Sequence, residues 1–517
     1  MRRIGIDVGG TNTDAVLIEE GKVTGAVKAP TSEDVTTGIL DSLRTLGATG
    51  VLKESTGALK RIDGVMIGTT HFINAVVQRR HLTKVGALRL GMPASASLPP
   101  FCDWPEDLAT LVRGGVWMVE GGHEYDGRLF MPLDEAPVTR AAQEMKAAGL
   151  KAVAISSIFS PLDPSHERRA AELVTAVIPD AAITCSSDLG RIGLLERENA
   201  GLLNAGLADL ARETIAAFEK AIRDSGIAAP LFITQNDGTV VEAAQARRLP
   251  VYSFASGATN SMRGAAYLSG MQDAMVIDVG GTTTDVGQLR NGFPREANSV
   301  VKVGGVRTLF RMPDLLSIGL GGGSHVVLDP LTVGPVSVGY RLLRDGIAFG
   351  GAQLTTTDVA VAMGVLDLGD KAKVAHLDRA TCLKVFAEAA RLAEEAIDRM
   401  KTEAGDVPLI AVSGGAFLIP DKMAGVSKVI HVQHGDCANA VGAAIAQVSG
   451  ECDQIFKDLT RVEAISAAQG IANDRAVAAG ASRASLTTIE SEDMPLAYLP
   501  GNSVRVRVRV VGDVAAG

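Results

Sequence analysis

Two stretches of the chain carry almost the same eight residues, and their residue types suit phosphate chemistry. Asp7–Asp14 reads DVGGTNTD and Asp278–Asp285 reads DVGGTTTD. Glycines let a backbone approach a polyanion closely, and amide, Thr and Asn groups donate hydrogen bonds to phosphate oxygens. The predicted phosphate-binding residues are Gly9, Gly10, Thr11, Asn12, Thr13, Gly280, Gly281, Thr282, Thr283 and Thr284.

The first aspartate of each copy is the candidate catalytic residue. A carboxylate beside phosphates is repulsive unless a divalent cation lies between them, so Asp7 and Asp278 are predicted to hold Mg²⁺ or to act as a base. A single Asp-x-Gly-Gly turn is equally typical of an ordinary β-hairpin. Two long matching copies favour phosphate binding.

Short apolar strands must position both loops. Residues 4–8, 14–18 and 22–28 predict three strands, and 274–278, 285–290 and 299–303 repeat that pattern. The chain therefore carries an internal duplication of a hairpin-led β-meander. Helices and strands alternate at 138–149, 152–159, 164–178 and 182–186, which predicts a mainly parallel sheet.

Composition limits the classes of function. A chain of 517 residues with 46% apolar residues predicts two or more α/β domains. The net charge of −9 argues against nucleic acid as a main partner. Five scattered cysteines form neither a disulfide framework nor a zinc motif, and no apolar run is long enough to span a membrane. Because residue 4 already begins a strand, no room is left for a signal peptide, so we expect a cytoplasmic protein.

Further polar turns are candidate substrate contacts, each with a plainer alternative. The candidates are Thr69, Thr70, His71 and Asn74 after a strand, and Gly322, Gly323, Ser324 and His325 in a glycine-rich turn. His325 is a candidate acid, base or metal ligand, or else an exposed residue of a flexible turn. The charged run 196–199 is interpreted as a solvated helix face, although it could line the cleft. Residues 451–480 predict a polar-faced helix, and the Arg–Val alternation of 505–510 predicts an edge strand protected by positive charge.

The order of these motifs resembles the nucleotide signature of the actin, Hsp70 and sugar-kinase superfamily. The third part of that signature is a late strand, 409–412, followed by Gly414 and Gly415. The resemblance implies an α/β fold in which two ribonuclease-H-like domains close over ATP. It also implies that the two loops grip the phosphates from opposite sides and that the Gly pair meets adenosine.

More narrowly, the chain resembles the hydantoinase A / 5-oxoprolinase family, of the N-methylhydantoinase A type. The matching segments are Ile4–Asp14, Gly68–Thr70 with Asn74 and Ala75, Asp278–Asp285, Gly319–Ser324 and Val333–Pro335. The resemblance implies ATP cleavage coupled to opening of a cyclic amide such as a hydantoin, 5-oxoproline or a lactam, or to carboxylation of a ketone. It implies a larger hydantoinase B-type partner subunit and an oligomer. The implied domains are 1–185, 186–450 and 451–517.

The coupling has a chemical reason. An amide carbonyl is a poor electrophile, and phosphorylating its oxygen makes a carbon that water can attack, which requires the phosphoryl group to be positioned and neutralised. The chain departs from the family at 71–75 and at 256–260, where the usual Gly-Pro-Ala-Gly-Gly turn is Ser-Gly-Ala-Thr-Asn, and it ends before the C-terminal domain of larger members. A subunit of a ketone carboxylase, a small-molecule kinase and a non-catalytic ATP-switched scaffold stay open as alternatives.

Overall fold

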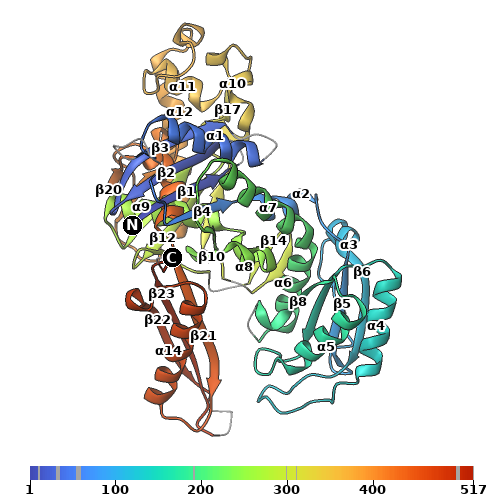
Figure 1. The fold of residues 1–517 in the computed structure, drawn as a ribbon. Helices are drawn as coiled ribbons and strands as arrows, with labels where there is room; N and C mark the ends of the chain where they lie inside the picture. The colour runs from blue at the N-terminus through green and yellow to red at the C-terminus, as the bar shows by residue number, and fades with distance from the viewer. Residues whose placement is uncertain are drawn as a thin grey trace.

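Two sheets with the same strand order form the core of the protein (Figure 1). The computed structural model describes residues 1–9, 12–30, 35–53, 60–189, 192–297, 300–309, 311–496 and 501–515. The first sheet contains the order β3-β2-β1-β4-β9, in which β1 is antiparallel to β2 and parallel to β4. These strands are β1 (Arg2–Val8), β2 (Asn12–Glu19), β3 (Lys22–Pro30), β4 (Gly64–Thr69) and β9 (Leu231–Thr234).

The second sheet repeats this arrangement in the order β13-β12-β11-β19-β20, with β11 antiparallel to β12 and parallel to β19. Its strands are β11 (Ala274–Val279), β12 (Thr284–Arg290), β13 (Phe293–Pro294), β16 (Leu315–Ile318), β19 (Val407–Val412) and β20 (Val426–His431). The predicted duplication and the predicted pair of ribonuclease-H-like domains are confirmed.

One predicted strand of the second repeat lies elsewhere. The repeat pattern predicts residues 299–303 beside β12, but β14 (Val301–Val303) pairs only with β15 (Val306–Thr308), in a separate two-stranded ribbon. The edge of β12 is filled by β13 and β16 instead. A further hairpin, β17 (Ser324–Leu328) with β18 (Leu331–Ser337), precedes the helices α10 (Leu342–Asp345), α11 (Thr356–Ala362) and α12 (Arg379–Met400).

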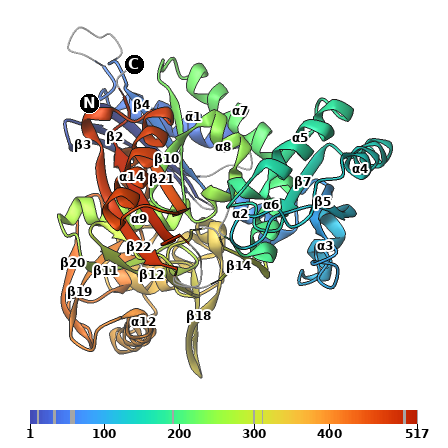
Figure 2. The same ribbon diagram turned by 90° about the horizontal axis from the view of Figure 1, so that it is seen from below.

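The chain between the first strands of the two repeats forms a separate parallel sheet. Figures 1 and 2 show this sheet to one side of the duplicated core. Its order is β6-β5-β7-β8, and every pairing is parallel. The alternation of helices and strands predicted here is confirmed. The elements are β5 (Val85–Met92), α3 (Glu106–Val112), β6 (Arg113–Glu120), α4 (Glu135–Ala147), β7 (Ala152–Ser157), α5 (Ser165–Val177) and β8 (Ala182–Cys185).

Helices connect this parallel subdomain to the core. The stretch from Leu194 to Asp224 forms two helices, α6 (Leu194–Gly206) and α7 (Ala208–Asp224). The charged run that begins α6 is not a solvated face, because Arg197, Glu198 and Asn199 are all buried. Glu198 pairs with the buried Arg89, and a polar run on a helix is therefore no guide to exposure when its partners come from another element. Other helices are α1 (Val35–Ala48), α2 (His71–Gln78) and α8 (Ala243–Arg248).

Two small-residue helices cross between the sheets. The apolar side chains of α9 (Ser256–Ser269) pack on the second sheet, and those of α13 (Ala438–Ile445) pack on the first. Their contact needs glycine: a Cβ at Gly264 would overlap the carbonyl of Ala438, and one at Gly442 would overlap that of Asn260. The small residues of α9 and α13 therefore allow the two helices to pack closely.

The C-terminal residues extend the first sheet to nine strands, in the order β22-β23-β21-β10 and onward to β9. The elements are β10 (Thr239–Glu242), β21 (Gln447–Phe456), α14 (Arg461–Ala478), β22 (Thr487–Pro495) and β23 (Val504–Gly512). The helix predicted over 451–480 is wrong in its first part, which is strand β21. The sheet therefore takes strands from all three of the residue ranges implied as domains.

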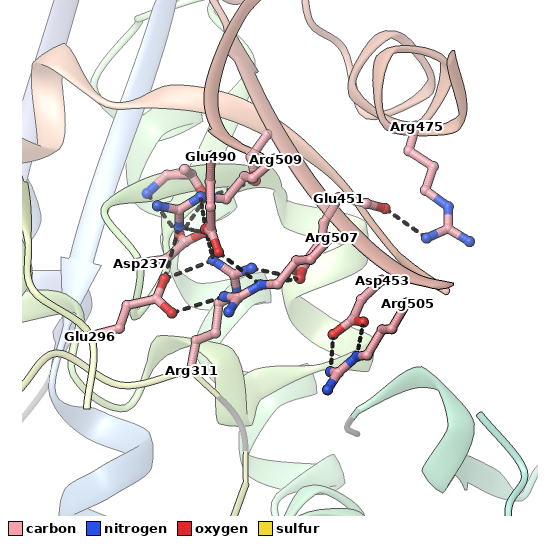
Figure 3. A network of polar contacts seen from close by, with 12 residues as sticks. Asp237, Glu296, Arg311, Glu451, Asp453, Arg475, Glu490, Arg505, Arg507 and Arg509 are labelled. Atoms are coloured by element: carbon pink, nitrogen blue, oxygen red, sulfur yellow. Dashed lines mark hydrogen bonds and ion pairs between the residues drawn. The ribbon is translucent and has the colours of Figure 1, made fainter. Parts of the chain in front are cut away.

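The arginine-rich strand is also not an edge strand, because β23 lies between β21 and β22. Figure 3 shows its arginines in a network with carboxylates from four other segments. Arg509 contacts Asp237 and Glu296, each at 3.2 Å, and Arg507 contacts Glu296 at 3.0 Å. Arg311 joins the same network through Glu296 at 2.7 Å. These charges are paired internally, which explains how an alternating cationic strand can be largely buried.

No helix in the described part of the chain is long and apolar enough to cross a membrane.

Candidate active site

The two predicted phosphate loops are equivalent hairpin turns. In the first, the amide of Gly9 donates to the carbonyl of Asn12 at 3.1 Å, and in the second, Gly280 donates to Thr283 at 2.9 Å. Asp7 stands opposite Asp14 and Asp278 opposite Asp285 in the strand pairs that flank the turns. Gly10 and Thr11 lie outside the described residues, while Gly281, Thr282 and Thr283 are exposed.

Asp7 is the most electrostatically perturbed residue of the first loop. Its side chain is 6% exposed, and Asn439 Nδ2 of α13 donates to Oδ2 at 3.3 Å. Its Oδ1 is buried and has no hydrogen-bond partner among the described residues. Burial, with a smaller contribution from the charge of Asp14, raises the pKa of Asp7 to about 7, while the Asn439 hydrogen bond opposes the rise. The charge of Asp278 makes a smaller contribution in the same direction.

The other three carboxylates are perturbed in the same direction. Burial raises the pKa of Asp278, which the hydroxyls of Ser261 and Ser413 oppose, although its side chain keeps some exposure to solvent. Burial likewise raises the pKa of Asp285 to about 6. Asp14 also has a raised pKa through burial, although it pairs with Lys28 Nζ at 2.8 Å. All four carboxyl groups therefore ionise less readily than an ordinary aspartate, and a nearby cation would favour their ionised forms.

The donor set fits Mg²⁺ shared with phosphates. Carboxylate oxygens are the ligands that Mg²⁺ prefers, and it usually keeps waters and phosphate oxygens in its shell. Asp7 Oδ1 and Asp14 Oδ1 are buried acceptors without partners in the described chain. No cluster of three or more His, Cys, Asp or Glu within that part of the chain is placed to hold a metal alone. A cation here needs oxygens from the nucleotide or from water.

The glycine-rich turn near residue 321 supports the second loop from behind. Gly322 donates to the Gly280 carbonyl at 3.0 Å, and Gly323 donates to that of Gly281 at 2.7 Å. Gly321 fits because it has no Cβ, which would lie 2.7 Å from the Gly280 oxygen. Gly322, Gly323 and Ser324, predicted to contact substrate, are buried in this contact, and His325 follows on β17, partly buried.

The other predicted substrate residues, Thr69, Thr70, His71 and Asn74, lie at the N-terminal end of α9. Thr69 is buried, and its Oγ1 lies 3.2 Å from His71 Nδ1. Asn74 Nδ2 donates to Thr70 Oγ1 at 3.2 Å. Burial lowers the pKa of His71, with a smaller contribution from His81. The structure thus brings these side chains together beside the first sheet's β4 strand.

The late glycine pair lies directly beside the second loop. Gly415 donates to the Val279 carbonyl at 2.8 Å, and a Cβ on it would lie 2.6 Å from the Val279 side chain. Gly414 is exposed, with no atom within 4 Å of where a Cβ would stand. Ser413 before it has a left-handed backbone with φ of +70°. The open face of Gly414 suits stacking of a flat ring.

Three uncharged residues of the site were missed by the sequence reasoning. Asn439 contacts Asp7, and Asn260 of α9 presents a buried Oδ1 with no hydrogen-bond partner among the described residues. Ser261 follows it, and its hydroxyl opposes the raised pKa of Asp278. Gly68 lies where the first sheet meets α9, because a Cβ there would touch Asn260 Nδ2 and lie 2.8 Å from Asp7 Oδ1. The sequence did contain one indication of Asn260, because residues 256–260 differ from the usual Gly-Pro-Ala-Gly-Gly turn of the family.

Comparisons with known proteins agree with this geometry. Residues 3–178 match the model of the hydantoinase/oxoprolinase N-terminal region, and residues 197–396 match that of hydantoinase/oxoprolinase. The chain is 28% identical to the caprolactamase subunit alpha of Pseudomonas jessenii over 70% of this chain and 54% of that protein. It is 27% identical to the acetophenone carboxylase gamma subunit of Aromatoleum aromaticum over 70% of this chain and 53% of that protein. The chain thus spans about half the length of these curated relatives.

Solved structures show the same fold. The crystal structure of ATP-dependent caprolactamase from Pseudomonas jessenii matches 99% of this chain and 88% of that chain, with a TM-score of 0.80 and 21% identity. The nucleotide-free structure of acetone carboxylase matches 100% of this chain and 89% of that chain, with a TM-score of 0.70 and 18% identity.

Proposed function

Because the chain belongs to the hydantoinase/oxoprolinase family, we propose that it is the ATP-dependent subunit of an enzyme that opens a cyclic amide. The substrate class is a hydantoin, 5-oxoproline or a lactam. The observation that carries the proposal is the pair of equivalent Asp-x-Gly-Gly turns, whose carboxylates Asp7 and Asp278 both have pKa values raised by burial. The similarity to a caprolactamase subunit supports a lactam in particular.

In this proposal the two loops hold the ATP phosphates from opposite sides. Amides and hydroxyls of the loops donate to phosphate oxygens, and Gly414 packs on adenosine. Asp7 and Asp278 hold Mg²⁺, which neutralises charge on the phosphates during transfer. Because burial raises the pKa of Asp7 to about 7, this carboxyl is only partly ionised at neutral pH, and a bound cation would favour its ionised form.

The reaction has three balanced steps. The amide carbonyl oxygen attacks the γ-phosphorus, the bond from that phosphorus to the bridging oxygen breaks, and ADP leaves. Water then attacks the activated carbon, the ring C–N bond breaks as the nitrogen takes a proton, and an acyl phosphate remains. A second water hydrolyses the acyl phosphate to the carboxylate, and inorganic phosphate departs with the former carbonyl oxygen. The chain's own contribution is to orient the two reactants and to exclude water until both are bound.

A subunit of an ATP-dependent ketone carboxylase is the second candidate, favoured by the similarity to the acetophenone carboxylase gamma subunit. In that case the enol oxygen of a ketone takes the place of the amide oxygen. In both cases we expect a hydantoinase B-type partner subunit and an oligomer, because these relatives are themselves named as subunits. We also expect a cytoplasmic location.

Phosphate release from Mg-ATP by the purified chain tests the proposal, with hydantoin, 5-oxoproline, lactams and simple ketones supplied one at a time. We expect one cyclic amide to stimulate release, and Asp278→Asn to lower that rate at least about 100-fold, as for loss of a group that stabilises transition-state charge. Stimulation only by a ketone with bicarbonate would identify the carboxylase. A stable phosphorylated product would identify a kinase, and turnover that responds to a protein alone would identify a scaffold.

A further inference from the structure

A second cavity lies at the carboxyl edge of the parallel subdomain. Its volume is about 410 Å³, within the range of roughly 300–1,000 Å³ that small-molecule sites occupy. Three groups of lining residues follow β5, β6 and β7, and a fourth begins α6. They are Ala94, Ser95, Ser97, Leu98, His123, Glu124, Phe130, Ile158, Phe159, Leu194, Leu195 and Glu196, with Arg89.

The topology of the sheet explains why a cavity forms there. In the order β6-β5-β7-β8, β6 lies on one side of β5, and β7 and β8 lie on the other side. Helix α3 packs with α6 on one face, while α4 and α5 cover the opposite face. The chain therefore leaves the neighbouring strands β5 and β7 in opposite directions, and ligands of open α/β sheets bind in the crevice at such a switch point.

The charges around the cavity do not favour an anionic ligand. The guanidinium of Arg89 is fully buried, and four of its five N–H donors go to the Glu198 carboxylate and to the carbonyls of Ser95 and Leu98. Its charge is paired with Glu198. The remaining charged lining residues are Glu124 and Glu196, and Glu196 pairs with Arg307 at 2.7 Å. The rest of the wall is mainly apolar, so the cavity suits a neutral molecule.

One buried polar atom of the wall lacks a partner. His123 is 4% exposed, and its Nε2 lies 3.4 Å from Asp163 Oδ2. That carboxylate favours the tautomer with the proton on Nε2, which leaves Nδ1 as an acceptor. Nδ1 is buried and has no hydrogen-bond partner among the described residues. The neighbouring His166, whose own Nδ1 accepts from the Gly122 amide at 2.9 Å, makes no hydrogen bond to this atom among the described residues.

A strained residue completes the rim. Phe159 lines the cavity with φ of +52°, a left-handed conformation that bulky side chains rarely adopt and that persists only where the surrounding structure holds it. It follows β7 directly, at the switch point. Strained backbone of this kind gathers at ligand sites.

We propose that this cavity is a second small-molecule site, distinct from the paired loops, that binds a neutral cyclic amide. The ring lies against the apolar wall and its N–H donates to Nδ1 of His123. The existence of the site rests on the cavity, whereas the choice of a cyclic amide as its ligand rests on the proposed function.

The test is a binding titration of the full chain without nucleotide, in which ligand-observed NMR detects binding. The probes are δ-valerolactam and N-methyl-δ-valerolactam, which differ by the N–H donor. We expect the N-methyl compound to bind about fivefold more weakly, the usual worth of one net hydrogen bond. His123→Phe should bring the two probes to equal affinity, and Ser97→Trp, at the exposed rim, should abolish binding of both.

Asp278→Asn serves as the control, because it alters the loops and should leave lactam binding unchanged. Three results would overturn the site: no saturable binding to the wild type, equal affinity for both probes in the wild type, or binding that Asp278→Asn removes and Ser97→Trp does not. Circular dichroism of each variant checks folding. If His123→Phe does not fold, the probe pair and Ser97→Trp still decide the question.

Discussion

The raised pKa of Asp7 makes a quantitative prediction for the Asp7→Asn variant. An ordinary aspartate has a pKa of 3.8, and burial raises that of Asp7 to about 7 in the folded protein. Between these two pH values the folded state binds more protons than the unfolded state, so the free energy of unfolding falls as pH rises. The asparagine side chain of the variant does not titrate, so the variant should lack this loss.

The magnitude follows from the size of the shift. At about 1.4 kcal/mol per pH unit, ionising Asp7 costs the folded protein about 4 kcal/mol once the pH exceeds 7, and about 2 kcal/mol at pH 5. Solvent screening is small because the side chain is 6% exposed. Asp7→Asn should therefore gain about 2–3 kcal/mol on the wild type between pH 5 and pH 8.

Urea unfolding at both pH values, without nucleotide or divalent cation, measures this gain. Asp14, Asp278 and Asp285 also have raised pKa values, but they are present in both proteins. Their contributions to the pH dependence of the free energy of unfolding therefore largely cancel in the comparison. Asp126→Asn is the matched control: hydrogen bonds from Arg128 lower the pKa of this surface residue, so no such gain is expected. Equal pH dependence in wild type and Asp7→Asn would refute the assignment of Asp7 as a carboxyl destabilised by burial.

Two further predictions concern the framework of the site. Gly442→Ala should destabilise the protein by about 2 kcal/mol or more and slow phosphate release, because its Cβ would overlap the Asn260 carbonyl and push α9 and α13 apart. Thermal unfolding measures this, with Gly470→Ala as the control, since a Cβ at that position of α14 meets no atom within 4 Å and should stabilise slightly. Arg509→Met should cost about 3–5 kcal/mol by leaving Asp237 and Glu296 short of a cation. Arg483→Met, which breaks only an exposed pair with Asp474, should change urea stability by less than about 0.5 kcal/mol, and equal effects of the two would contradict a structural role for the network.

Local signals in the sequence were sufficient for the duplicated core. A short apolar strand, an Asp-x-Gly-Gly turn and a second strand lie within about fifteen residues of one another in each copy. The two strands pair with each other and need no distant partner. Their apolar residues and the turn residues between them are therefore sufficient to predict the pairing. The helix–strand alternation of the parallel subdomain is predictable for the same reason.

Charged residues with distant partners were not predictable in this way. Arg505, Arg507 and Arg509 alternate with valines, a pattern that is equally typical of an exposed edge strand. Their carboxylate partners include Asp237, Glu296 and Asp453, which the chain places on other elements. Only the folded structure shows that these charges compensate one another, as it does for Arg89 and Glu198.

The neutral side chains of the candidate active site depend on contacts that are more distant still. Asn260 and Asn439 come close to Asp7 because α9 and α13 cross between the sheets, and that crossing requires the absence of a Cβ at Gly264 and Gly442. A glycine in a helix normally costs about 1 kcal/mol relative to alanine. The cost is offset here by close packing of two helices, each of which covers one sheet. The distance between the two loops is therefore set by the thickness of this helix pair, and the polar lining between Asp7 and Asp278 comes from the same helices.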